Sequence, residues 1–491
     1  MLPCRAVDHA RIDTIVHGGQ VVTAGDVAPL DIAICGERIA ALGDAEVLPP
    51  AQRYVDARGK LVLPGAIDCH IHLGPEYDDW RGGSIAAAHA GLTTLLGFVL
   101  YDDARRETLP DAIQRLRAEV ETQSVLDFGF HMILNNQPYV LAGVAEAARL
   151  GVTSFKLFMT YKRRPNRMCP DDFICRAMTA IAAAGGITQL HCENGDVLAY
   201  LEEEAIAAGR VRPTDFPATC PDWAEEEAIA RAIRLGALTG CPVYVVHLST
   251  ALGLARIREA QARGQRVWTE TCPQYLLLTE DAMARWGPFA KIGPPLRPAA
   301  GPDRDALWRG SADGTIATVG SDHAPRAPQA KEPGWANIFV DAAGRPVPFG
   351  APSVETLVPL LYSEGVVKRG LPLTWLARVL SENPARIFGL YPRKGAIRVG
   401  GDADLLLIDP EARGVIRAAD HRGIAGYTLY EGWAVHGRPW MTFLRGRVLL
   451  RDGRLEQAPG AGRYLVRGSP RPPLGVATLG SAPAWTAPAP R

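Results

Sequence analysis

Two histidines separated by a single residue end an apolar segment early in the chain. The segment runs from Leu61 to His72 and finishes in the order Asp68-x-His70-x-His72. Side chains alternate between the two faces of a β-strand, so His70 and His72 are expected on the same face. Two imidazoles on one face can share a metal ion, although a pair of packed core histidines would have the same spacing. We predict a metal site at the end of this strand.

Further residues able to ligate a metal lie in or after other strand-like segments. They are Lys156 within Phe155–Met159, His191 at the end of Ile187–His191, His247 at the end of Val243–His247 and Asp322 shortly after Thr318–Gly320. Each means little alone, but the strands of a βα-barrel all end at one face, where such side chains would form a ring. A mixture of imidazole and carboxylate suits a borderline metal such as Zn²⁺.

A lysine inside an apolar strand needs an explanation, because an isolated buried ammonium is costly. Lys156 could extend to solvent or form an ion pair. Alternatively, its amine could be N-carboxylated by CO₂, which would convert it into an oxygen ligand that bridges two metal ions. The residues alone leave both explanations open.

The middle of the chain has the pattern that would place these residues together. From about Gly59 to Lys394, strand-like runs alternate with Ala-rich amphipathic segments, for which we expect helices over residues 83–89, 109–121, 224–238 and 251–263. This repetition predicts an α/β fold with a TIM-like (β/α)8 barrel rather than an open sheet.

Both ends of the chain are instead rich in short alternating strands with glycines at the turns. Short isolated hairpins are not stable, so the two ends are expected to meet. We predict a small discontinuous β-sandwich from residues 1–58 and 395–456, around a barrel formed by residues 59–394. Residues 457–491 are rich in Pro, Gly and Ala and predict an extended or disordered tail.

Composition excludes several classes of partner. Of 491 residues, 53 are basic and 53 acidic, so no basic surface for nucleic acid is expected. No signal peptide or apolar run long enough to span a membrane is evident, which predicts a cytoplasmic protein without a membrane partner. One short basic run is interpreted as part of a solvated loop: Lys162, Arg163, Arg164 and Arg167.

Several longer motifs occur together along the chain. They are Pro64-Gly65-x-Ile67-Asp68-x-His70-x-His72, Ser154-Phe155-Lys156-Leu157-Phe158-Met159-Thr160-Tyr161-Lys162, His191-Cys192-Glu193-Asn194, Val246-His247-Leu248-Ser249, Glu270-Thr271-Cys272-Pro273-Gln274-Tyr275-Leu276, Pro294-Pro295-Leu296-Arg297, Ser321-Asp322-His323 and Asn383-Pro384-Ala385-Arg386. Through these motifs the sequence, up to about Arg467, resembles the dihydropyrimidinase and hydantoinase family of cyclic amidases in the amidohydrolase superfamily.

The resemblance implies a centre of two divalent metal ions per subunit, for which Zn²⁺ is expected. One ion would be held by His70, His72 and Asp322. The second would be held by His191 and His247, and N-carboxylated Lys156 would bridge both. A hydroxide between the ions would then attack a ring carbonyl, because two cations lower the pKa of a shared water.

Two of the residues would also act on the substrate. The resemblance implies that Asp322 takes the proton of the attacking water and returns it to the leaving nitrogen. Tyr161 matches a tyrosine that donates a hydrogen bond to the developing oxyanion, although an aromatic ring packed at the barrel rim would also fit its position. The implied activity is hydrolytic opening of a cyclic amide, imide or ureide.

Departures from the family pattern concern the substrate. The loop after His72 is short, Gly293 stands where the family has a serine, and Phe349 begins the segment that matches the family's Asn-Gly-Gly-Pro-Gly. Leu357 stands where an arginine is common. We expect Tyr161, the backbone of Gly293 and Phe349 to contact a ring substrate that differs from the usual dihydropyrimidine.

Two alternatives to a hydantoinase remain open. An allantoinase or another cyclic-amide amidohydrolase would share the site, and the short loop after His72 resembles allantoinases and dihydroorotases. A dihydroorotase is disfavoured because the arginine that commonly follows its HxH motif is absent. Non-catalytic scaffold homologues have lost metal ligands, whereas this chain has all of them. The resemblance also implies a homotetramer, with a dimer as the alternative.

Overall fold

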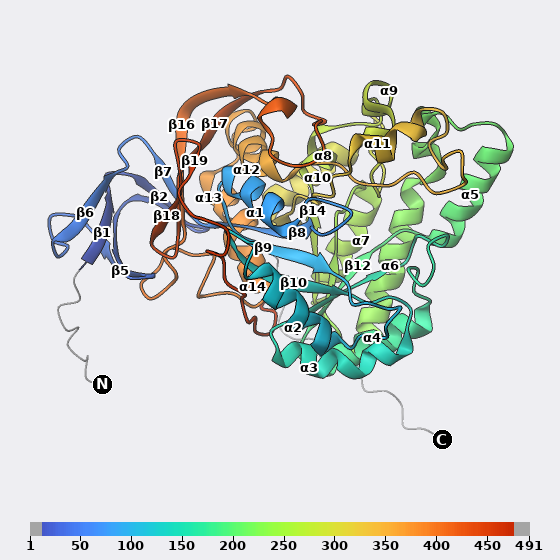
Figure 1. Cartoon of the computed structure of the whole chain (residues 1–491), viewed down its shortest axis with the longest axis horizontal. Coiled ribbons are helices and arrows are strands. Elements are labelled where there is room, and N and C mark those ends of the chain that lie inside the picture. Colours follow the sequence, from blue (N-terminus) through green and yellow to red (C-terminus); the bar gives the residue numbers. More distant parts are fainter. Residues whose placement is uncertain (1–11, 476–491) are drawn as a thin grey trace.

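The structure, a computed structural model, describes residues 12–475 and is built around a parallel barrel sheet (Figure 1). The sheet has eight strands in chain order: β8 (Ala66–His72), β9 (Leu92–Val99), β10 (Asp127–Ile133), β11 (Ser154–Phe158), β12 (Ile187–His191), β13 (Val243–Val245), β14 (Val267–Thr271) and β15 (Thr318–Val319). A parallel bridge between Ile71 and His323 joins the first strand to the segment after the last. The predicted TIM-like barrel is confirmed.

Helices follow the strands and cover the barrel. The main ones are α1 (Trp80–His89), α2 (Leu109–Val120), α3 (Val144–Arg149), α4 (Asp171–Ala183), α5 (Gly195–Ala207), α6 (Asp222–Thr239), α7 (Ala251–Ala262) and α10 (Asp303–Asp313). The helices expected from the alanine-rich segments correspond to α1, α2, α6 and α7. Asp79, Thr108 and Thr250 cap α1, α2 and α7 by accepting a backbone N–H with their side chains, which fixes where these helices begin.

The two chain ends meet in two further sheets. One contains β1 (Ile12–His17), β4 (Asp31–Cys35), β5 (Arg38–Gly43) and β6 (Ala51–Asp56). The other contains β2 (Gln20–Val22), β3 (Val27–Pro29), β7 (Leu61–Pro64), β16 (Leu405–Val415), β17 (Ala434–Leu444), β18 (Arg447–Arg451) and β19 (Arg454–Leu455). Apolar side chains from both sheets form one buried cluster, and Figure 1 shows the early strands β2 and β7 beside the late strands β16, β17 and β18. The predicted β-sandwich is confirmed.

The segment Leu61–His72 is divided at Pro64-Gly65, as these two residues predict, into two strands that belong to different sheets. Leu61–Pro64 forms β7, which pairs with β2 and β16 of the sandwich, whereas Ala66–His72 forms β8 of the barrel. The chain changes sheets at Gly65, where an added Cβ would lie 2.3 Å from Thr93 Oγ1 and 2.8 Å from Asp404 Cβ. Only glycine fits so close an approach.

The described part of the tail, residues 457–475, is extended and packs on its own barrel. Tyr464 forms a parallel bridge with Phe128 on β10. Arg467 is buried and donates hydrogen bonds to Ser154 Oγ at 2.9 Å and to the backbone oxygen of Phe130. These contacts lie at or near the starts of β10 and β11, opposite the barrel face that carries the histidines. Within the described residues, no helix is long and apolar enough to cross a membrane.

A buried ion cluster joins the barrel to the sandwich. Lys394 Nζ lies 2.7 Å from Asp127, 3.2 Å from Asp402 and 2.5 Å from Asp404. Asp127 begins barrel strand β10, and the other two carboxylates precede sandwich strand β16. The three carboxylates are close enough to hold a cation, and the lysine ammonium supplies it. Removing one member of a buried ion cluster leaves uncompensated charge.

We predict that Lys394→Met lowers the free energy of unfolding by about 3–5 kcal/mol. The exposed pair of Lys162 with Asp196 gives the control, since Lys162→Met should cost less than about 1 kcal/mol. Urea unfolding followed by circular dichroism measures both. Equal midpoints for the two variants would show that the cluster does not stabilise the junction.

Candidate metal centre

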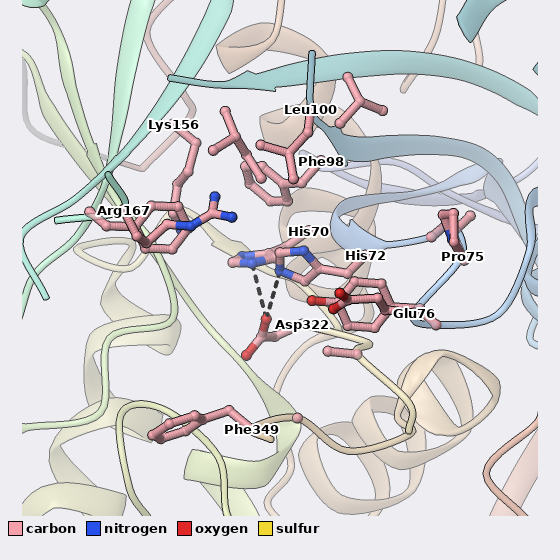
Figure 2. A pocket seen from close by; sticks show the side chains of 18 of the residues that line it. His70, His72, Pro75, Glu76, Phe98, Leu100, Lys156, Arg167, Asp322 and Phe349 are labelled. Carbon is pink, nitrogen blue, oxygen red and sulfur yellow. Dashed lines mark ion pairs between the residues drawn. The ribbon is translucent and has the colours of Figure 1, made fainter. Parts of the chain in front are cut away.

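All of the predicted metal ligands line one cavity of about 510 Å³: His70, His72, Lys156, His191, His247 and Asp322. They lie in or shortly after β8, β11, β12, β13 and β15, at the carboxyl ends of the barrel strands. This is the face at which TIM barrels carry their active sites. Figure 2 shows four of them around one open space, with Phe349 on the wall across from Lys156.

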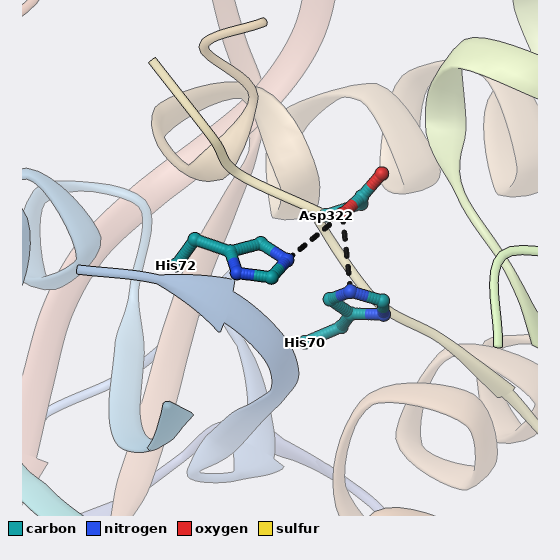
Figure 3. A group of neighbouring side chains, drawn as sticks. All are labelled: His70, His72 and Asp322. Carbon is teal, nitrogen blue, oxygen red and sulfur yellow. Dashed lines mark ion pairs between the residues drawn. The ribbon is translucent and has the colours of Figure 1, made fainter. Parts of the chain in front are cut away.

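His70, His72 and Asp322 form the tightest group in the cavity (Figure 3). Oδ1 of Asp322 lies 3.0 Å from Nε2 of His70 and 3.5 Å from Nε2 of His72. His70 is fully buried, whereas the side chains of His72 and Asp322 each retain about 15% exposure toward the cavity. The alternation of β8 places both imidazoles on the inner face, as expected.

The remaining three residues lie beside this group. The ring centroids of His191 and His247 are 4.4 Å apart, and those of His70 and His247 are 5.4 Å apart. Lys156 Nζ is buried 5.0 Å from the ring centroid of Phe98 and 5.3 Å from that of Phe158. The lysine is therefore surrounded by aromatic rings and does not reach bulk solvent.

The donor atoms present fit a metal ion. Nδ1 of His247 is buried and has no hydrogen-bond partner among the described residues, and Nε2 of His70 contacts only the Asp322 carboxylate. Buried polar atoms are nearly always satisfied, so an unpartnered ring nitrogen at this cavity calls for a ligand. Imidazole nitrogens with one adjacent carboxylate are a donor set suited to a divalent transition metal.

Carboxylates outside the predicted set orient these imidazoles. Glu270 on β14 contacts Nδ1 of His70, accepts from the Tyr244 hydroxyl at 2.9 Å and accepts from the backbone N–H of His247 at 3.2 Å. Glu193 lies 2.6 Å from Nε2 of His191. A carboxylate on one ring nitrogen fixes the tautomer and leaves the other nitrogen free for a metal. The sequence motifs contain both glutamates, but nothing in the sequence indicates which histidine each one contacts.

The pKa shifts of the proposed metal ligands differ in direction. Burial lowers the pKa of His72 to about 4, so its imidazole is neutral. Burial opposes the charged form of His70, but the carboxylates of Glu270 and Asp322 raise the pKa of His70 to about 9. Burial lowers the pKa of Lys156 to about 8. The fraction of Lys156 that has a free amine near neutral pH is therefore larger than for an ordinary lysine.

Three residues of the cavity have a backbone conformation that is rare outside glycine. Their φ angles are +67° at Tyr161, +39° at His247 and +49° at Asp322. Such conformations cost about 1–3 kcal/mol each and are retained where the surrounding structure requires them, typically at functional sites. The sequence gives no sign of this feature.

The expected substrate-contacting residues also line the cavity. The Tyr161 ring meets His191 edge-on with centroids 5.1 Å apart, and it lies 5.4 Å from the Phe349 ring. A Cβ at Gly293 would come within 3.0 Å of the Tyr161 hydroxyl and 3.2 Å of Phe349. The glycine found here in place of serine therefore leaves room for both aromatic rings. Burial raises the pKa of Tyr161, which keeps its hydroxyl protonated.

Comparison with known proteins places the chain in a family. The model of the amidohydrolase family matches residues 61–449, which is most of the chain. The chain belongs to the amidohydrolase family. This amidohydrolase is 34% identical to a D-hydantoinase of Rhizobium radiobacter over 466 residues, which cover 93% of this chain and 99% of the relative.

Two further comparisons bear on the fold and the substrate class. An allantoinase of Rubrobacter xylanophilus is 36% identical over 458 residues, which cover 92% of this chain and 97% of the relative. The crystal structure of dihydropyrimidinase from Brevibacillus agri superposes with a TM-score of 0.88 at 36% identity, covering 94% of this chain and all of that one. The predicted family is confirmed.

The basic run after Tyr161 divides into two pairs. Lys162 and Arg163 are exposed and form ion pairs with Asp196 at 2.6 Å and Glu202 at 3.0 Å. Arg164 and Arg167 are half-buried and line the cavity. The interpretation of the whole run as a solvated loop is therefore wrong for Arg164 and Arg167, because the loop turns back over the barrel mouth.

We predict that Glu270→Gln weakens the affinity for Zn²⁺ about 10–100-fold, because an amide cannot hold the His70 tautomer as a carboxylate does. Isothermal titration of metal-free protein measures the change. Glu259→Gln on the exposed face of α7 is the matched control and should bind Zn²⁺ as the unmodified protein does. Equal affinities for all three proteins would contradict the orienting role of Glu270.

Proposed function

We propose that this amidohydrolase is a binuclear metal-dependent hydrolase of the hydantoinase or dihydropyrimidinase type, which opens a cyclic amide, imide or ureide ring. The observation that carries the proposal is the convergence of all six ligating side chains on one cavity at the barrel mouth. The hydantoinase and allantoinase relatives cover nearly the whole chain and support this substrate class.

Zn²⁺ is the proposed metal. His70, His72 and Asp322 would hold one ion. His191 and His247 would hold the second ion, and N-carboxylated Lys156 would be a ligand to both. The lowered pKa of Lys156 supports the modification, because only the neutral amine reacts with CO₂. Two ions held here would polarise the ring carbonyl and lower the pKa of a water molecule, which are the contributions that amide hydrolysis needs most.

Asp322 is proposed to move the proton. Although burial favours its neutral form, the charge of His70 and hydrogen bonds from His70 and His72 hold the pKa of Asp322 well below its usual range. Its carboxylate is therefore available as a base at neutral pH. The same group can return the proton to the ring nitrogen as the C–N bond breaks, since it lies at the centre of the cavity.

Tyr161 is proposed to stabilise the charge that develops on the carbonyl oxygen. Its hydroxyl is protonated and lies next to Gly293. The hydrogen-bond donor and the backbone expected to contact the substrate therefore lie on the same wall of the cavity. A donor fixed in place before the reaction stabilises the transition state without reorganisation. Phe349, in contact with the Tyr161 ring, would form the apolar wall against which a flat ring packs.

An allantoinase activity is the second candidate, and the allantoinase relative favours it. A non-catalytic scaffold is disfavoured because every ligand position holds a ligating residue. We also propose a cytoplasmic homotetramer, with a dimer as the alternative, and no nucleic-acid or membrane partner.

The test combines metal analysis with a panel of rings. Protein produced in Zn²⁺-supplemented medium should contain about two ions per subunit and open at least one of hydantoin, dihydrouracil, succinimide and allantoin. His247→Ala should lose metal and ring-opening activity while the circular dichroism spectrum stays unchanged. If protein from this medium contains no metal and opens none of these rings, the result would support a non-catalytic scaffold instead.

A further inference from the structure

Arg167 directs a positive charge into the cavity. Its guanidinium carbon lies 5.2 Å from the ring centroid of Phe158, and the same ring lies 5.3 Å from Lys156 Nζ. Figure 2 shows the guanidinium pointing toward the space occupied by His70. Arg167 and the proposed metal ligand Lys156 thus pack on the same aromatic ring.

Arg164 has the same relation to a different ligand. Its guanidinium carbon lies 4.7 Å from the ring centroid of Tyr161, and the Tyr161 ring packs edge-on against His191. The same guanidinium lies 5.8 Å from the Phe349 ring. Arg164 therefore covers the aromatic wall on which the substrate ring is proposed to pack.

Arg326 repeats the arrangement on a third aromatic ring of the cavity. Its guanidinium carbon lies 4.1 Å from the ring centroid of Tyr77, and that centroid lies 5.5 Å from the His72 ring. Arg326 Nη1 forms an ion pair of 2.8 Å with Glu76, whose side chain is 75% exposed. Its Nε is buried without a partner among the described residues.

The charges of this group are only partly compensated. Within residues 12–475, no carboxylate forms an ion pair with Arg164 or Arg167, unlike the neighbouring Lys162 and Arg163, which both have partners. A hydrogen bond from Arg326, followed by the charges of Arg326, Arg164 and Arg167, lowers the pKa of Glu76 despite its partial burial. A carboxylate at the cavity mouth is thus stabilised by all three arginines.

Other charged residues of the cavity do not neutralise the positive charges of Arg164 and Arg167. Arg115 on α2 is paired with Glu107, and Asp102 is paired with Arg105. Glu119, also on α2, lines the cavity as well. Asp102 and Glu119 therefore lie at or near the α2 wall, whereas Arg164 and Arg167 belong to the loop after β11.

We propose that Arg164 and Arg167, together with Arg326, bind a carboxylate carried outside the substrate ring. This inference rests on the proposed ring-opening function and specifies its substrate class. The guanidinium groups lie one aromatic ring away from the metal ligands, so the carboxylate would sit on a substituent and not at the scissile bond. The planar fork of arginine matches a carboxylate with two parallel hydrogen bonds, and the aromatic rings below hold the fork in place.

A pair of substrates of equal shape tests the inference. Hydantoin-5-acetate carries the carboxylate, and hydantoin-5-acetamide replaces it with a neutral group. The metal-loaded protein should prefer the acid by about 10–100-fold in kcat/KM, the range expected for hydrogen bonds to a charged group. Arg164→Gln and Arg167→Gln should each reduce this preference about tenfold, because KM for the acid rises about tenfold more than KM for the amide.

Lys162→Gln in the same loop is the matched control, because its charge is already paired outside the cavity, and it should keep the full preference. Metal content and thermal melting of each variant show whether it is folded and loaded. Arginine variants that lose acid and amide turnover equally would show that the arginines only support the aromatic wall, which overturns the inference. Turnover of hydantoin with no preference for the acid would also overturn it and leave the proposed function intact. Turnover of none of these three hydantoins would overturn the inference, and the panel with dihydrouracil, succinimide and allantoin would then decide the proposed function separately.

Discussion

The structure depends on the burial of many polar side chains at one point. Imidazoles of His70, His191 and His247, the Lys156 amine and the Asp322 carboxylate meet in a cavity walled by aromatic rings. Without a bound ligand this burial is costly, because Nδ1 of His247 lacks a partner and the Lys156 amine is removed from water. Cations between these groups would satisfy the donors, so the stability of the site and its chemistry have the same origin.

Contacts outside the cavity hold these side chains in place despite the unfavourable free energy of burying them. Glu270 and Glu193 fix two of the imidazoles from outside the cavity, and the strained residues Tyr161, His247 and Asp322 each follow closely after a barrel strand. At the opposite end, the sandwich is joined to the barrel through buried Lys394, and the extended tail packs against the starts of the strands. A rigid scaffold is what allows a site to remain preorganised.

Sequence patterns were sufficient for the features that depend on local periodicity. The alternation of β8 predicts that His70 and His72 share a face, and the repeat of strands and helices predicts the barrel. Contacts between residues distant in sequence could not be predicted in this way. Nothing local shows that Glu270 meets His70, that Gly65 passes Thr93 too closely for a side chain, or that the loop after Tyr161 turns Arg164 and Arg167 inward. Substrate selection, which depends on such loops, is therefore the least predictable property.

The central claim is that the six side chains of the metal centre bind two cations, with N-carboxylated Lys156 as a ligand to both. Anomalous diffraction from crystals of the Zn²⁺-loaded protein tests it most directly. We expect two zinc peaks inside the cavity lined by His70 and His247, and electron density for a carboxylate beyond Nζ of Lys156. A metal-loaded crystal with no anomalous peak in this cavity, and with Lys156 ending at its amine, would contradict the account.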